Sequence, residues 1–321
     1  MKKLYIKGAL LALLVVAVIG CGKKQDYVVT QVTKPIFIAE GVREVSINKQ
    51  DREVMHIVYN PQEYEASFEH WKMKVPYGDE VVVDTEEALK IYQQLVMMDM
   101  QMEVAPDGVK EDFEDPLGKI KINFCQTTEE ERASAVIGQE TDKTISSSYQ
   151  MTPDSTATLL IGGNDGQGNY YVGYEGDKST IFLLDEAMVN VILDINPFNY
   201  ILKISAIANK ETMKSITIKM DGQTHKLSEA QLEEQVYRTL YTDILSVFVI
   251  EEIPDVGKVG KETILRIECK RNVKGAPDLH ISYHPWDDEK YAVTVNKGTY
   301  FLVNSADVDE LKAKITEAFA E

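Results

Sequence analysis

The sequence predicts an α+β protein built from two tandem, divergent copies of one unit, an antiparallel sheet with helices in the order β-β-α-β-β-β-α. One observation is a repeated hairpin and helix start. At a constant offset of 119, Phe182, Leu183, Asp185, Ala187 and Val189 match Phe301, Leu302, Asn304, Ala306 and Val308. The second observation is that the alternating segment 42–47 matches 213–218 in chemical type, position for position. Such a repeat determines the architecture before any single element is considered.

The N-terminal 40 residues predict an exported protein. Lys2, Lys3 and Lys7 precede an apolar run over 9–19, which is typical of a signal peptide and short for a membrane span. Val18-Ile19-Gly20-Cys21 resembles the lipobox of bacterial lipoproteins, in which the cysteine is diacylated on sulfur and becomes the first residue after cleavage. An uncleaved anchor helix is the alternative.

The lipobox resemblance divides this region into a signal peptide, residues 1–20, and a lipid-anchored tether, residues 21–40. Cys21 is the predicted lipidation site, and the predicted location is the extracytoplasmic face of the cell membrane. A lipobox cysteine has at least two acyl chains, which anchor stably, whereas one chain binds only marginally.

The charge of the chain excludes one class of partner. The 321 residues have a net charge of −18, and removal of residues 1–20 takes away three lysines and no acid, which leaves −21. Such a body is repelled by phosphates, so nucleic acid is not an expected partner, and membrane contact is expected through the lipid alone. The remaining length fits two domains of ordinary size.

The first unit is predicted over 41–197. Its leading strand passes through a polar turn into a partner strand, and a helix follows over 85–98. Asp84 and Glu87 have capping-box spacing. The residues expected on the buried face of this helix are Ala88, Ile91, Tyr92, Leu95 and Met98.

The second unit is predicted over 198–321, after Asn196-Pro197, because a residue before proline is disfavoured in a helix. Its helix is predicted over 228–250, with Ser228 and Gln231 as a capping box. The expected buried stripe is Leu232, Val236, Leu240 and Ile244.

The offset between matched pieces shrinks along the chain, which indicates insertions in the first copy near 60–84 and 126–155. Cys125 and Cys269 end strand-like runs at matching places in the two copies. A disulfide between them is possible outside the cytoplasm, but two separate buried thiols are the favoured interpretation.

Short segments of the first unit resemble a family of bacterial lipoproteins and membrane-anchored proteins, the domain of unknown function 4340 family. The segments are Trp71-Lys72-Met73, Asp115-Pro116-Leu117-Gly118, Leu160-Ile161-Gly162, Tyr170-Tyr171-Val172 and Ile181-Phe182-Leu183-Leu184-Asp185. The resemblance covers most of 42–195, with a weaker second match over 212–318. It implies an extracytoplasmic accessory component of ABC-type export systems of the gliding-motility-associated kind, and it supplies no catalytic residues.

Motifs for chemistry are weak. The Gly-rich segment 162–169 lacks the lysine of a phosphate loop and leads into a strand, so a turn is predicted. His280 and His284 lie four apart on a strand, about 13 Å from each other and too far for one metal ion, so surface histidines are expected. With no nucleophile motif either, we predict a protein that is not an enzyme and has no cofactor or metal.

Tyrosine and tryptophan near predicted turns are the remaining functional signal, because these residue types are enriched at interfaces. The candidates are Trp71, Tyr170, Tyr171, Trp286 and Tyr291, although such rings also cover small sheet cores. The predicted function is a membrane-anchored accessory or binding component whose partners are membrane lipid and ABC transporter permease subunits. A structural protein of the cell envelope is the alternative, followed by an envelope hydrolase.

Overall fold

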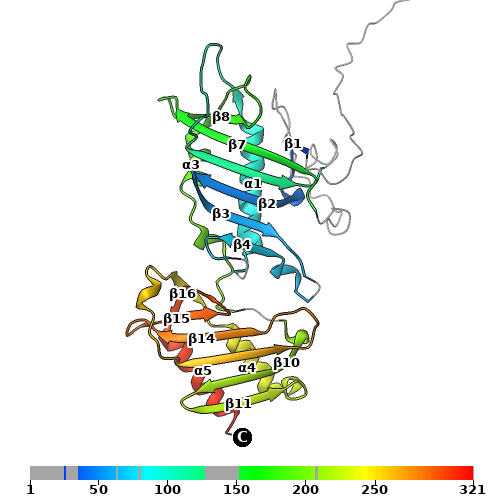
Figure 1. Ribbon diagram of the computed structural model, residues 1–321, viewed down its shortest axis with the longest axis vertical. Coiled ribbons are helices and arrows are strands. Elements are labelled where there is room, and N and C mark those ends of the chain that lie inside the picture. Colours follow the sequence, from blue (N-terminus) through cyan, green and yellow to red (C-terminus); the bar gives the residue numbers. More distant parts are fainter. Residues whose placement is uncertain are drawn as a thin grey trace, which may run out of the picture.

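The computed structural model describes residues 25–26, 35–62, 64–78, 81–126, 152–206 and 209–320 (Figure 1). Within these ranges the chain forms two antiparallel sheets, one above the other in Figure 1, with the helices of each unit behind its sheet. The predicted α+β class with two similar sheet units is confirmed.

The first sheet has the strand order β4-β3-β2-β6-β7-β8-β9-β5, and β1 pairs in parallel with β7. Its strands are β1 (Gln25–Asp26), β2 (Val42–Lys49), β3 (Arg52–Tyr59), β4 (Trp71–Val75), β5 (Glu103–Val104), β6 (Gly118–Phe124), β7 (Ser155–Asn164), β8 (Asn169–Tyr174) and β9 (Phe182–Asp185). The helices of this unit are α1 (Thr85–Gln101) and α3 (Glu186–Leu193).

The second sheet has the order β11-β10-β13-β14-β15-β16-β12. Its strands are β10 (Met213–Met220), β11 (Gln223–Ser228), β12 (Val249–Glu252), β13 (Leu265–Arg271), β14 (Leu279–Pro285), β15 (Lys290–Val295) and β16 (Gly298–Asn304). Helices α4 (Gln235–Leu245) and α5 (Ser305–Ala318) pack against each other behind it.

The two sheets match strand for strand, since the path from β3 to β5 has the same connectivity as the path from β11 to β12. The repeated hairpin also keeps its register, with Phe182 opposite Val172 and Phe301 opposite Val293. Among the described residues, each copy has five strands between the helices α1 and α3 or α4 and α5, which is more than the predicted order allows. One additional strand is the short one that follows the first helix of each copy, β5 or β12. The other arises because the two arms of the hairpin, β8 and β9 or β15 and β16, are separate strands.

Helix α1 agrees with its prediction, whereas the predicted helix over 228–250 is wrong at both ends. Asp84 caps α1 by accepting from the backbone N–H of Glu86 and Glu87, and the expected stripe is buried. Ser228 instead ends β11, and its N–H and hydroxyl both donate to Gln231 Oε1, at 3.1 and 3.0 Å, beside a short 3-10 turn.

Helix α4 therefore occupies only the middle of the predicted span. The apolar run that follows it is rich in β-branched residues, favours extended backbone, and enters β12 at Val249. Val236, placed in the predicted buried stripe, is 38% exposed, so this part of the stripe is also wrong.

Tight turns and buried thiols complete the predicted local features. In the Gly-rich turn between β7 and β8, Asp165 Oδ1 accepts from the N–H of Gln167 and of Asn169, and Gly166 and Gly168 have positive φ. The prediction of a turn is confirmed.

Cys125 and Cys269 are buried thiols that are not joined to each other, which confirms the favoured interpretation.

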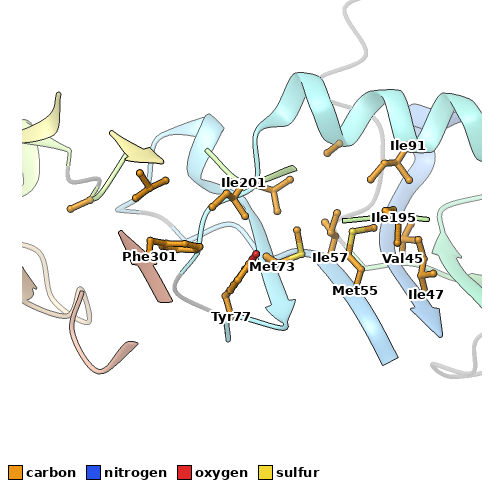
Figure 2. Close-up of a cluster of buried hydrophobic side chains, with 14 of the residues drawn as sticks. Val45, Ile47, Met55, Ile57, Met73, Tyr77, Ile91, Ile195, Ile201 and Phe301 are labelled. Atoms are coloured by element: carbon orange, nitrogen blue, oxygen red, sulfur yellow. The ribbon is translucent and has the colours of Figure 1, made fainter. Parts of the chain in front are cut away.

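The apolar core continues from one unit into the other. Figure 2 shows side chains from Ile47 through Met73 and Tyr77 of the first unit to Phe301 of the second. Phe182, in the hairpin of the first unit, is fully buried. Phe301 is 7% exposed, and its ring is packed against Phe198 and against Tyr77 of the first unit, so a residue from outside its own unit contributes to its burial.

Candidate functional site

The insertion near 60–84 forms the junction between the two units. It adds β4 to the edge of the first sheet and then presents Tyr77 to the second unit. The Tyr77 hydroxyl donates to Glu252 Oε1 at 2.5 Å, and its ring lies 4.9 Å from the ring of Phe301, centroid to centroid (Figure 2). The insertion that makes the first copy longer therefore provides contacts that join the two units.

The connector over 200–205 is hydrogen-bonded to both units. Its Leu202 N–H donates to Val82 O at 2.9 Å in the first unit, and its Ser205 N–H donates to Val247 O at 2.8 Å in the second. Isolated bridges at Ile201 and Ile204 extend the same pairing. The connector thus behaves as a short strand between the edges of the two sheets rather than as a free linker.

A cavity of about 410 Å³ lies at this junction. Its walls come from three sources: the insertion of the first copy, the connector, and residues of the second unit from the end of β13 and from β14, β15 and β16. Small-molecule sites usually have volumes of about 300–1,000 Å³ and occur preferentially at domain interfaces. This cavity is therefore the candidate functional site.

The acidic groups at the cavity are already engaged within the protein. Glu65 Oε1 lies 2.9 Å from Lys72 Nζ, and both side chains are about one-tenth exposed. The other oxygen of Glu65 accepts from the Gln62 N–H at 3.2 Å. Glu69, which is 4% exposed, accepts from the Ala66 N–H at 2.9 Å. Both carboxylates are therefore held by groups of the first copy.

Arg271, on the opposite wall, is the cation of the cavity that has no carboxylate partner within ion-pair distance among the described residues. Its Nη1 donates to Thr212 Oγ1 at 2.6 Å, and its Nε is buried with no hydrogen-bond partner there. Burial, followed by the charge of Glu65, raises the pKa of the nearby Tyr64 hydroxyl, and the positive charge of Arg271 opposes that rise.

Lys203 is a second unusual cation at the junction. Its ammonium donates to the Phe198 carbonyl and lies over the Phe198 ring, 3.1 Å from the centroid. Burial lowers the pKa of Lys203 from 10.5 to about 8, and the carboxylates of Glu252 and Asp84 oppose this shift. The folded protein therefore favours the neutral amine more than the unfolded chain does.

Replacing Lys203 with methionine is expected to remove a pH dependence of stability. The pKa of Lys203 is lower in the folded protein than in the unfolded chain. The contribution of its neutral amine to the free energy of unfolding is therefore greatest above pH 10.5 and is lost as the pH falls through about 8. Urea unfolding of the wild type and of Lys203→Met between these limits measures it. Stability of the wild type should rise relative to the variant as the pH increases. A difference that stays constant with pH would contradict the prediction.

The structure does not bring the five predicted aromatic residues to one surface. Trp71 is on β4 and packs between the rings of Tyr59 and Tyr92, at centroid distances of 5.0 and 5.2 Å. Tyr170 and Tyr171 are on β8, separated from β4 by four strands of the first sheet. Trp286 and Tyr291 belong to the second unit, where Tyr291 packs partly against the core. All five are half-buried.

The other predicted site residues are placed as follows. The predicted lipidation site, Cys21, lies outside the described residues. His280 and His284 are both on β14, and His284 Nδ1 lies 2.8 Å from Glu262 O. Within the described ranges no group of three His, Cys, Asp or Glu side chains is placed to hold a metal ion.

The cavity residues were missed from the sequence because they are far apart in it. Tyr64, Ile204 and Arg271 come from three separate segments. The available signal was the insertion near 60–84, whose position beside the second copy could not be read from its length.

The chain matches no protein-family model, no curated protein and no solved structure. In the part of the chain that the structure describes, none of the helices combines the length and the apolar character needed to cross a membrane.

Proposed function

We propose that this chain is a lipid-anchored, extracytoplasmic, non-enzymatic accessory or binding component that works beside an ABC-type export system. The observation that supports the anchor best is the sequence Ile19-Gly20-Cys21 after a lysine-rich start and an apolar run. The partner class rests on the segments of the first unit that resemble the lipoprotein family named above.

The tether gives the proposal a geometric consequence. Gln25 begins β1, which pairs with Ser155 of the first sheet. Only four residue steps separate Cys21 from Gln25, and an extended chain spans at most about 14 Å over four steps. A lipidated Cys21 therefore holds the first unit close to the membrane surface, where the extracytoplasmic parts of a transporter lie.

The junction cavity supports a binding role for the same component. It lies between two units whose connector is hydrogen-bonded to both of them. A ligand at this place contacts both copies at once, so its binding stabilises the folded arrangement of the two units.

Co-purification from membranes tests the partner class. The full-length protein with a C-terminal tag is cross-linked in cells and isolated in mild detergent, and the proteins recovered with it are identified. We expect ABC transporter permease subunits to be enriched over a Cys21→Ala sample, which lacks the anchor. Recovery of wall-assembly proteins without any permease would contradict the proposal and favour a scaffolding role.

A further inference from the structure

We propose that the cavity between the two units binds a small organic anion, with a carboxylate or a similar acidic group at Arg271 and an apolar body against the second sheet. The proposal goes beyond the accessory role and does not depend on the membrane anchor. Three features of the cavity support it: an unmatched cation, amide N–H groups available as donors, and an apolar wall.

The unmatched cation is Arg271. Arg266, on the same strand, has Glu268 at 2.9 Å, whereas Arg271 has no such partner among the described residues. The guanidinium of Arg271 is half-buried, and its Nε–H has no hydrogen-bond partner in the described structure. It therefore loses hydrogen bonds to water on folding, and the protein does not replace the one at Nε. An anion in the cavity supplies the missing interaction, and guanidinium is well suited to planar acidic groups.

The remaining polar groups of the cavity also favour an acceptor-rich ligand. The side-chain oxygen of Asn60 accepts from Gln62 Nε2 at 3.0 Å, and that of Asn296 accepts from the His280 N–H at 3.0 Å. With these oxygens engaged, each asparagine has amide N–H groups left as donors. The carboxylates of Glu65 and Glu69 are held by Lys72 and by backbone N–H groups. The cavity therefore offers amide N–H donors in addition to the Arg271 guanidinium.

The apolar wall determines the chemistry of the part of the ligand that does not contact Arg271. Leu279, Val293 and Phe301 contribute it from three adjacent strands, and Leu202 and Ile204 of the connector extend it. A bare inorganic anion leaves this wall in contact with water, whereas an aliphatic or aromatic body removes apolar area from water at about 25 cal/mol per Å². The volume of about 410 Å³ admits a drug-sized molecule or smaller.

Calorimetric titration of the full-length protein in mild detergent tests the proposal, with the detergent buffer alone as the blank. The probe is 4-phenylbutyrate, which has an apolar ring and one carboxylate, and the matched neutral probe is 4-phenylbutanamide. We expect saturable binding of the acid with one site per chain. The amide should bind at least about tenfold more weakly, because a hydrogen bond to a charged group is lost. Sulfate alone should bind more weakly than the acid.

Two variants locate the site. Arg271→Gln should weaken the acid at least about tenfold and leave the amide unchanged, whereas the exposed Arg266→Gln on the same strand should change neither. Val295→Trp retains Arg271 but fills the cavity, and it should abolish binding of both probes. Unfolding midpoints of all variants, measured by tryptophan fluorescence, establish that they are folded.

The comparison of acid and amide on the wild type needs no variant. Equal affinities for the two probes, or no binding of either, would overturn the proposal. Acid binding that persists in Val295→Trp would place the probe elsewhere and would overturn it as well. Sulfate binding as tight as that of the acid would contradict the apolar part of the site.

Discussion

Replacing Cys21 with alanine is expected to abolish lipid attachment and to leave the protein either released from its lipid anchor or as an unprocessed precursor. The thiol of Cys21 is the predicted acceptor of the acyl chains, and the lipobox that residues 18–21 resemble implies cleavage before residue 21. Two or more acyl chains give stable anchoring, so their loss changes the location of the protein completely. Metabolic labelling of cells with a radioactive or clickable fatty acid measures the result directly.

The chain offers a matched control for this experiment. Cys125 is a buried thiol in the folded body, so Cys125→Ala should leave fatty-acid labelling unchanged. Label that persists in Cys21→Ala would exclude Cys21 as the lipidated residue, and an uncleaved anchor helix would then be the better interpretation.

Phe182→Ala is expected to cost about 3–5 kcal/mol of unfolding free energy, through lost burial and the space left behind. Phe182, the first residue of β9 in the repeated hairpin, is fully buried, and its ring lies 6.4 Å from that of Tyr174, centroid to centroid. A protein stable by about 5–15 kcal/mol cannot easily tolerate this loss. Urea unfolding of the wild type and the variant gives the difference.

The equivalent change in the second copy should cost less. Phe301 borders the junction cavity, so its removal enlarges an existing space and breaks the ring contact with Tyr77 instead of opening a new void in a closed core. Val191 is 46% exposed, so Val191→Ala serves as a surface control. It should change the free energy of unfolding by no more than about 0.5 kcal/mol. A loss below about 1 kcal/mol for Phe182→Ala would show that the hairpin is not part of the core.

The sequence was sufficient to predict the repeated sheets, because their signals are local and occur twice. The alternation in 42–47 and 213–218 fixes which side chains face the core, and β2 and β10 have Val45 and Ile216 fully buried there.

Other features could not be predicted because they depend on contacts between distant residues. Glu103–Val104 forms a strand only because it pairs with β9, and two residues show no periodicity of their own. The end of α4 is set by the pairing of Val249 with Val303, which overrides the apolar spacing that continues through the helix. The candidate site joins Tyr64 and Arg271 through the arrangement of two units, for which the sequence has no local signal.

The hydrogen bond between Tyr77 and Glu252 joins residues that are 175 positions apart, so it can form only after the chain through Glu252 is available to fold. Domains generally fold N-terminal first as the chain emerges. The first copy, with its insertion, is therefore complete while most of the second is still being made, and it presents Tyr77 as a preformed surface. The second copy finishes its fold against that surface. Phe301, among the last strand residues to emerge, is covered only when this docking occurs.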